Sequence, residues 1–351
     1  MQHVSKSFEI DGRPIGPGEP TYVIAEMSAN HGQDYGKAVE LVHAAKQAGA
    51  DAIKLQTYTA DTLTLDCKKP VFEAKGAWQG QYLHDLYAGA YMPWEWHEPL
   101  QELAKSIGLT LFSSPFDPTA VDLLESLDMP AYKIASPELI DLPLIRRVAT
   151  TGKPVIISTG NGTLAEINEA VQAALSGGGR DIALLKCTST YPAPPEDTHL
   201  RTIPHMASAF GCPVGLSDHT LGTAVPIASV ALGASIVEKH FVLSKDDETA
   251  DSFFSVTPEE LGEMVQSIRI AEQAVGRVDY PLEPRPAQRS LIAVRDIRKG
   301  EPLTTDNIRS LRPGGGLPPK EIERVVERRA TFDIERGTPL EWSMIGDRRP
   351  V

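Results

Sequence analysis

A repeating unit constrains the fold of this chain more than any other feature. A short apolar or β-branched run is followed by a polar turn with glycine or proline, and then by a stretch of helical periodicity. This pattern is typical of parallel strands joined by helices. Eight such units follow one another, with strands predicted over residues 22–27, 52–56, 109–113, 131–134, 155–158, 183–186, 214–216 and 236–239.

Eight consecutive units predict a closed (β/α)8 TIM barrel, although a doubly wound open sheet would look similar over any few of them. Polar residues at the strand ends favour the barrel, because there the ends converge on the face where active sites of this architecture lie. In an open sheet they would be spread along an edge. These residues are Glu26, Lys54, Gln56, Ser113, Ser114, Lys133, Ser158, Lys186, Ser217, His219, Lys239 and His240.

Three further segments complete the predicted organisation of the chain. The motif around Asp11-Gly12 predicts a hairpin over residues 7–17 that closes the far end of the barrel. We expect the catalytic domain to span residues 1–278 and a proline-rich linker to span residues 279–288. Short strands and glycine turns predict a separate, small β-rich domain over residues 289–351.

The second predicted connection, from about residue 57 to residue 107, is unusually long and rich in tryptophan and tyrosine. Long insertions on the catalytic face tend to be functional, so part of this one could shape a ligand pocket. A plainer interpretation is that the segment 93–96 begins the second helix and packs its indoles on the barrel.

Composition excludes several classes of protein. A net charge of -13 and the lack of a dense basic stripe argue against a nucleic-acid partner, although a few local lysines could still bind a small anion. No apolar run approaches the ~20 residues needed to span a bilayer, and the first ten residues contain no apolar signal core. We therefore expect a cytoplasmic protein without a membrane partner. Its three cysteines form no CxxC pair and are expected to be reduced.

Two histidines indicate a metal site. His219 and His240 follow the seventh and eighth predicted strands, and adjacent strand ends of a barrel lie within reach of one ion. Two imidazoles with oxygen ligands would suit Mn²⁺ or a similar divalent ion better than structural zinc. Either histidine alone would more often be a hydrogen-bonded core residue.

Three lysines at strand ends, Lys54, Lys133 and Lys186, indicate an anion site, since buried lysines are costly unless an anion compensates them. Salt bridges to a carboxylate such as Glu26 or Glu238 are the structural alternative.

A third group is acidic, namely Glu26, Glu138 and Asp251; such carboxylates could move protons or hold sugar hydroxyls. Glu138 could equally cap the helix predicted near Leu142. Arg312, in a glycine turn, could reach a ligand or simply lie on the surface.

The chain contains, in order, the stretches YVIAEMSANHG, ADAIKLQTYTAD, FSSPFD, YKIASPE, VIISTGN, KCTSTYPAPPED, GLSDHT and EKHF, followed by LRPGGGLPP. With these motifs it closely resembles the sialic acid synthase family of nonulosonate synthases, in which a TIM barrel precedes an antifreeze-like (SAF) domain. QTYTADTLTLD and YMPWEWH are most similar to the pseudaminic acid synthase branch. The chain departs from the sialic acid synthases at Ser189, where they have asparagine, and in the pocket loop.

The resemblance implies condensation of phosphoenolpyruvate with 2,4-diacetamido-2,4,6-trideoxy-β-L-altrose, with release of phosphate. N-acetylneuraminate or legionaminate synthesis is the alternative within the family. A metal-dependent aldolase or deoxy-sugar-acid phosphate synthase would share the barrel and lysines without needing the C-terminal domain. A non-catalytic sugar-binding or ice-interacting protein would have no use for buried lysines.

The resemblance also implies roles for individual residues. Glu26, Glu138, His219 and His240 would be catalytic, and both histidines would hold Mn²⁺ or Mg²⁺, with Co²⁺ as a further option. Arg312 would reach the site of a partner subunit, which implies a homodimer with exchanged domains. The remaining residues implied to bind phosphoenolpyruvate or the amino sugar are Lys54, Gln56, Ser114, Lys133, Ser136, Ser158, Ser189, Tyr191, Ser217 and Asp251.

Overall fold

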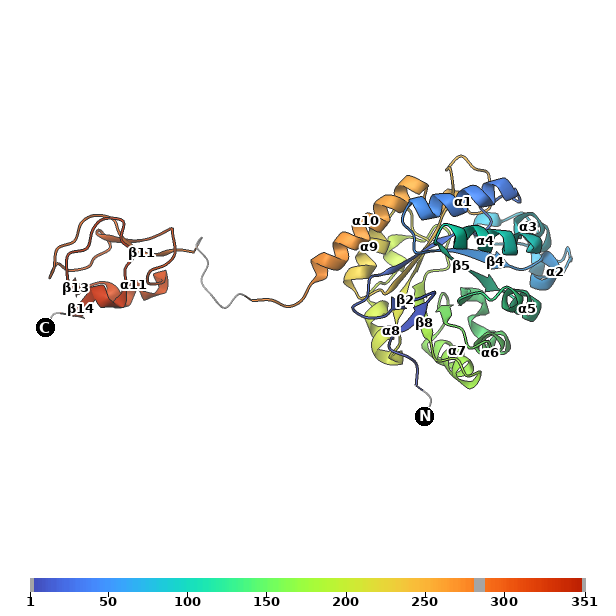
Figure 1. Ribbon diagram of the computed structural model, residues 1–351, viewed down its shortest axis with the longest axis horizontal. Helices are drawn as coiled ribbons and strands as arrows, with labels where there is room; N and C mark the ends of the chain where they lie inside the picture. The colour runs from blue at the N-terminus through green and yellow to red at the C-terminus, as the bar shows by residue number, and fades with distance from the viewer. Residues whose placement is uncertain (1–2, 281–287, 349–351) are drawn as a thin grey trace. The chain divides into compact units, whose positions relative to one another are not determined.

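The computed structural model describes residues 3–280 and 288–348, and the chain forms two compact units, Met1–Gly276 and Arg277–Val351 (Figure 1). Residues 281–287 of the predicted linker, and the last three residues of the predicted C-terminal domain, lie outside the described residues. Each unit is described by itself. None of the described helices is long and apolar enough to span a membrane.

The first unit is a closed barrel of eight parallel strands, in which each strand pairs with the next and β10 pairs with β3. His240 lies opposite Glu26 where the barrel closes, which excludes the open sheet. All eight predicted strands are present, with ends shifted by at most two residues. They are β3 (Tyr22–Glu26), β4 (Ala52–Thr57), β5 (Thr110–Pro115), β6 (Tyr132–Ile134), β7 (Val155–Ser158), β8 (Ile182–Cys187), β9 (Val214–Asp218) and β10 (Ile236–His240).

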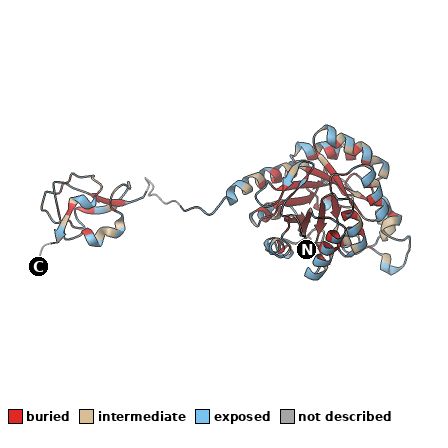
Figure 2. Ribbon diagram, turned by 60° about the horizontal axis from the view of Figure 1, so that its bottom comes forward, coloured by how far each residue is buried: buried red, intermediate tan, exposed pale blue. Residues whose placement is uncertain are grey.

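Helices surround the strands, with buried strands inside and exposed helix faces outside (Figures 1 and 2). Side-chain caps fix several helix starts: Asp34, Asp117 and Asp141 each accept a hydrogen bond from the first turn, and Thr163 and Thr257 form capping boxes. The helices are α1 (Tyr35–Gln47), α4 (His97–Ser106), α5 (Pro118–Ser126), α6 (Leu142–Ala149), α7 (Leu164–Ser176), α8 (Thr202–Phe210), α9 (Ala224–Ala231) and α10 (Pro258–Val275).

The N-terminal hairpin closes one end of the barrel, as predicted. Strands β1 (Phe8–Ile10) and β2 (Arg13–Ile15) pair antiparallel around Asp11 and Gly12, which both have positive φ as a two-residue hairpin turn requires. The apolar hairpin side chains join one buried cluster with inward-facing residues near the amino ends of the barrel strands. This cluster contains Phe8, Ile10, Ile15, Tyr22, Ile24, Ala52, Phe112, Ala131, Ile156, Ala183, Leu185 and Ile236. Because this end is filled with apolar side chains, any ligand must enter from the other.

The connection between β4 and α4 is an insertion with structure of its own. It contains α2 (Ala60–Leu63), α3 (Leu83–Ala90) and the 3-10 turns η1 (Pro70–Phe72), η2 (Gly76–Trp78) and η3 (Trp94–Trp96). The plainer interpretation is confirmed for η3, which leads directly into α4. Trp96 packs on the rings of His31 and Tyr35, and the Trp94 indole donates to the Tyr58 carbonyl at 3.1 Å.

The second unit is small and has its own core. Strand β11 (Ser290–Ala293) pairs antiparallel with β12 (Ile308–Leu311), and β13 (Arg328–Ala330) pairs with β14 (Ile345–Arg348). The short helix α11 (Ile322–Val325) lies between β12 and β13 in sequence. The buried cluster includes Leu291, Leu303, Ile308, Val325 and Leu340. Short paired strands and one helical turn agree with the β-rich domain predicted here.

Candidate active site

A ring of polar side chains lines a cavity of about 380 Å³ in the barrel unit. Strand side chains alternate between the two faces, so residues two apart share a face. The apolar cluster at the closed end holds Ile24, Ala52, Phe112, Ala131, Ile156 and Ile236; two residues further along each strand, polar side chains occupy the same face. Every strand contributes to the ring at its carboxyl end: Glu26, Lys54 and Gln56, Ser114, Lys133, Ser158, Cys187, Ser217, and Glu238 with His240.

Lys186 is not part of this ring, so its assignment to the anion site was wrong. Leu185 is in the apolar cluster inside the barrel and Cys187 lines the cavity, which leaves Lys186 on the opposite face of β8. Its Nζ donates to the Cys187 carbonyl at 2.8 Å and to the Thr188 hydroxyl at 3.2 Å. Position at a strand end did not suffice, because the alternation along the strand decides which side a residue faces.

The two remaining lysines share two carboxylates on the cavity floor. Lys54 forms an ion pair with Glu26, donates to Ser114 Oγ at 3.1 Å, and lies 4.0 Å from Oε1 of Glu238. Lys133 Nζ lies 3.6 Å from the same Glu238 oxygen. All four side chains are buried. The alternative interpretation is therefore observed, since both lysines contact these carboxylates, while both also line the cavity where an anion site was predicted.

Burial and charge set the protonation of this group. Burial opposes the charged form of Lys54, but Glu238 and Glu26 outweigh it and raise the pKa of Lys54. Burial likewise opposes ionisation of Glu238, yet Lys133 and Lys54 lower its pKa. For Lys133 burial dominates and lowers the pKa. A bound anion would favour the protonated form of Lys133, since an opposite charge compensates for lost hydration.

Hydroxyl groups gather beside these lysines. The Gly160 amide donates to Ser136 Oγ at 3.0 Å, and a Cβ atom at Gly160 would lie 2.2 Å from Ser189 Oγ and 2.7 Å from Ser136 Oγ. The hydroxyls of Ser158 and Ser189 are buried and lack a hydrogen-bond partner. Buried polar groups are rarely left unpaired, so these hydroxyls indicate a site for a ligand with several acceptor oxygens.

The two predicted metal ligands lie together. The ring centroids of His219 and His240 are 5.3 Å apart, and both side chains line the cavity. His219 Nδ1 lies 2.8 Å from the Thr188 carbonyl, while His240 Nδ1 is buried without a hydrogen-bond partner. The carbonyl contact orients the imidazole of His219, as second partners do at metal sites. Within the described ranges no third carboxylate, thiol or imidazole completes a compact ligand group here. The pair fits an open divalent site completed by water or substrate oxygens.

A polar network joins Asp251 to the cavity floor, and Tyr191 lies beside His219. The Ser28 hydroxyl donates to Asp251, whose Oδ2 lies 3.7 Å from His240 Nδ1. Gln56 Nε2 donates to Ser28 Oγ and to Glu26 Oε1, both at 2.9 Å. The ring of Tyr191 stacks near His219, with centroids 4.3 Å apart. Asp251 and Tyr191 therefore place hydrogen-bonding atoms beside the two histidines.

Glu138 lies in the turn η4 (Ser136–Ile140), beside the cavity lining. It does not cap α6, since Asp141 accepts the hydrogen bond from the amide of Leu144. One buried Glu138 oxygen has no hydrogen-bond partner. Burial raises the pKa of Glu138 to about 7, although Lys133 opposes the shift. A carboxyl group with such a pKa can exchange a proton near neutral pH.

Comparison with known proteins agrees with this geometry. The NeuB family matches residues 41–280, and the SAF domain matches residues 288–346. The chain belongs to the NeuB family. It is 43% identical over 329 residues to pseudaminic acid synthase of Helicobacter pylori, covering 92% of this chain and 97% of that protein. It is 37% identical over 344 residues to N,N'-diacetyllegionaminic acid synthase of Legionella pneumophila, covering 95% and 97% respectively.

Solved structures share the architecture of this NeuB family chain. N-acetylneuraminic acid synthetase from Leptospira borgpetersenii superposes with a TM-score of 0.72 at 28% identity, covering 82% of this chain and 95% of the other. The spore coat polysaccharide biosynthesis protein SpsE of Bacillus subtilis gives 0.68 at 33% identity, covering 97% and 99%. The predicted family and fold are confirmed.

Sequence reasoning missed several residues of the NeuB-type cavity. The sequence indicates Glu238 only as a salt-bridge partner, although it lies two residues before His240 on the same face of β10. Cys187 lies two residues after Leu185, on the face of β8 that points into the barrel. Ser28, Tyr58 and Trp78 also line the cavity, but they follow strands or lie in the insertion, where no periodicity identifies them. Arg312 belongs to the second unit, where its side chain is exposed, and is described there alone.

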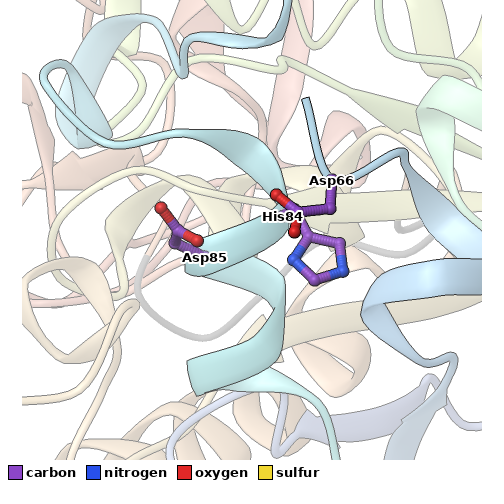
Figure 3. Close-up of side chains that lie close together, drawn as sticks. All are labelled: Asp66, His84 and Asp85. Carbon is purple, nitrogen blue, oxygen red and sulfur yellow. The ribbon is translucent and has the colours of Figure 1, made fainter. Parts of the chain in front are cut away.

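One other group could resemble a metal site. Figure 3 shows His84 and Asp85 on α3 with Asp66 nearby, the only group of three ligand atoms within 4.8 Å among the described residues. Lys68 pairs with Asp85 and Asp66, and His84 Nε2 lies 3.0 Å from Asp61. Both Asp66 and Asp85 are exposed. A solvated surface charge network accounts for this group without an ion.

Proposed function

We propose that this enzyme condenses phosphoenolpyruvate with 2,4-diacetamido-2,4,6-trideoxy-β-L-altrose and releases phosphate, as a carbon–carbon bond-forming transferase. The observation that carries the proposal is the juxtaposition of the unpaired buried hydroxyl of Ser158 and of Lys133 with the His219–His240 pair in one cavity. Relatives at 43% identity over most of the chain are named pseudaminic acid synthase, which favours this acceptor.

The donor would lie over the lysines and serines. Phosphoenolpyruvate carries a phosphate and a carboxylate, and charge-assisted hydrogen bonds to such groups are about twice as strong as neutral ones. Lys54 and Lys133 would supply the positive charge, and the hydroxyls of Ser136 and Ser189, which pack closely against Gly160, would add hydrogen bonds. The other donors around this site are Ser114, Ser158 and Ser217.

His219 and His240 would hold Mn²⁺ or Mg²⁺, with Co²⁺ a further option. Such an ion, when bound, supplies Lewis-acid polarisation of the acceptor aldehyde. Asp251 and Tyr191 would hold sugar hydroxyls beside the histidines, and Gln56 links Asp251 to Glu26 through Ser28. This arrangement directs the aldehyde end of an open-chain sugar toward the donor.

The remaining carboxylates would handle water and protons. Glu26, buried beside Lys54, would order the water that adds to the former enol carbon of the donor. Glu138 has a pKa raised by burial to about 7 and would exchange the proton at the aldehyde oxygen. The lysines would stabilise the charge that develops on the departing phosphate.

We further propose that the enzyme works as a homodimer in which Arg312 of one subunit completes the cavity of the other. The exposed guanidinium stands in a glycine turn of the SAF domain, a position that suits bidentate binding of a carboxylate or phosphate. The phosphoenolpyruvate and sugar precursors are cytoplasmic metabolites, so we place the reaction in the cytoplasm. Legionaminate synthesis remains the second candidate, since a relative at 37% identity bears that name.

A substrate panel tests the proposal. The full-length protein is incubated with phosphoenolpyruvate, Mn²⁺ and one of three acceptors: the diacetamido L-altro sugar, its D-manno isomer, or N-acetylmannosamine. Phosphate release and product mass are measured. The L-altro sugar should give the highest kcat/KM. Preference for either other acceptor would move the enzyme to the legionaminate or neuraminate branch. Phosphate release only with phosphorylated arabinose or erythrose would make the whole assignment wrong.

A further inference from the structure

One part of the cavity wall differs in character from the polar floor. The insertion between β4 and α4 contributes Tyr58, Ala74, Lys75, Trp78, Leu83, Leu86, Tyr87 and Ala90, and the loop after β5 adds Phe116. Apart from Lys75, the Tyr hydroxyls and the indole nitrogen, these side chains offer only apolar surface. The cavity therefore pairs a charged floor, made by strand ends, with an apolar wall made largely by one insertion.

Helix α3 presents a single face to this cavity. Leu83, Leu86, Tyr87 and Ala90 are spaced three and four residues apart, the spacing of one helical face. None of the four is fully buried, whereas Asp85, Ala88 and Gly89 on the other sides of α3 are exposed. An apolar helix face normally packs against protein, yet this one borders the space above the catalytic floor.

The wall is anchored in place by polar contacts at its edges. The Trp78 indole donates to the carbonyl of Ala250 at 3.0 Å, next to Asp251. Gln33 Nε2 donates to the carbonyls of Ala88 and Tyr91 at 3.0 and 3.1 Å, which ties the end of α3 to the loop after β3. The ring of Tyr87 contacts that of Tyr58, with centroids 5.8 Å apart. These contacts hold the apolar face over the barrel mouth.

We propose that the apolar face of α3, centred on Leu83 and Leu86, is the specificity determinant for the methyl groups of the acceptor. This inference rests on the proposed function. A 2,4-diacetamido-2,4,6-trideoxy sugar carries two acetyl methyls and a C6 methyl, whereas N-acetylmannosamine carries one acetyl methyl and a C6 hydroxyl. Burial of each methyl against this apolar wall is favourable, whereas a C6 hydroxyl would lose hydration there without gaining a hydrogen bond. Because this face of α3 lines the same cavity as the proposed catalytic residues, we infer that it contacts the substrate and not a protein partner.

The experiment compares Leu86→Asn with the conservative Leu86→Met and with Leu65→Asn. Leu65 belongs to the same insertion, is 63% exposed and does not line the cavity. Steady-state kinetics are measured with the diacetamido sugar and with phosphoenolpyruvate varied in turn. Thermal unfolding confirms that each variant is folded. Leu83→Asn gives a second, independent position on the face.

Leu86→Asn should raise the KM of the diacetamido sugar about 10- to 100-fold while the KM of phosphoenolpyruvate changes less than about twofold. Leu65→Asn should stay close to the native enzyme, and Leu86→Met, which keeps the position apolar, should raise the sugar KM less than Leu86→Asn does. A sugar KM within twofold of native for both Leu86→Asn and Leu83→Asn, or an equal rise in both KM values, would overturn the inference alone. A native enzyme without activity toward either diacetamido sugar would refute the proposed function, and the inference with it.

Discussion

The ammonium group of Lys239 lies 2.5 Å from Oδ2 of Asp218, and both side chains are almost completely buried. Lys239 also donates to the Thr220 carbonyl, so β10 is tied to both residues that flank His219. Lys239 itself immediately precedes His240. This pair therefore connects the two segments that carry the candidate metal ligands.

Replacement of Lys239 by methionine should strongly destabilise the protein. The variant leaves the Asp218 carboxylate buried without its cation, which typically costs about 3–5 kcal/mol. Chemical denaturation of Lys239→Met should show this loss, and the double variant Lys239→Met/Asp218→Asn should recover part of it. Mn²⁺ affinity measured by calorimetry should fall in both. Unchanged affinity in the folded double variant would mean that the pair stabilises the barrel without orienting the histidines.

Alanine at Gly160 should impair donor binding. Its Cβ would overlap the hydroxyls of Ser189 and Ser136, so either the turn or both serines must move. The loss of one or two hydrogen bonds to phosphate should raise the KM of phosphoenolpyruvate about tenfold or more, with a smaller effect on the sugar KM. Gly262→Ala, at a glycine of α10 where a Cβ would meet only ordinary contacts at 3.9 Å, controls for general effects of a glycine replacement. Equal changes in both KM values would argue against a phosphate site here.

His219→Ala should abolish turnover and weaken divalent-ion binding. The ring centroids of His219 and His240 are 5.3 Å apart in the native protein. Without His219, His240 would have no neighbouring imidazole to share the ion. Calorimetric titration with Mn²⁺ should detect one site in the native protein and much weaker binding in the variant. Treatment of the native enzyme with a chelator should have the same effect on activity, with recovery on adding Mn²⁺. Full activity of the variant would remove the histidine pair from the mechanism.

The stability contribution of Glu138 should depend on pH. Because burial raises its pKa to about 7 in the folded protein, the folded state binds more protons than the unfolded state between about pH 4.5 and 7. Native stability from this group therefore falls as pH rises through that window. Glu138→Gln cannot titrate and so removes this pH dependence. The unfolding free energy of the variant minus that of the native protein should therefore increase by about 1–3 kcal/mol between pH 4.5 and pH 8. A pH-independent difference would contradict the raised pKa.

Subunit mixing tests whether Arg312 acts on a partner. Arg312→Ala and His219→Ala should each be inactive alone. If the arginine works in trans, a mixed dimer has one site with both residues intact, so equal mixing should restore about a quarter of native activity. The mixture is dissociated and reassociated before assay, with unmixed samples treated identically as controls. No recovery, despite mixed dimers detected by mass spectrometry, would place Arg312 in its own subunit's site. An active Arg312→Ala variant would place the residue outside any site.

The barrel and most of the polar ring in its cavity could be predicted because both depend on short-range patterns. Strand composition and turn residues recur eight times, and single polar positions such as Glu26, Lys54 and His240 mark the carboxyl ends of β3, β4 and β10. Lys186 shows the limit of that reasoning. Lys186 lies near the carboxyl end of its strand, as Lys133 does. Because side chains alternate along β8, Lys186 points away from the cavity and the next residue, Cys187, lines it.

The sequence by itself determined the eight βα units, the closing hairpin, the separate C-terminal domain and the family, since each is encoded in local periodicity or in contiguous motifs. Only the tertiary structure decided that Glu238 bridges both lysines and that Gly160 packs against two serines from other loops. It also placed the apolar face of α3 in the same cavity as the polar strand ends. These contacts join residues far apart in the chain, and their geometry depends on barrel closure, which no local pattern specifies.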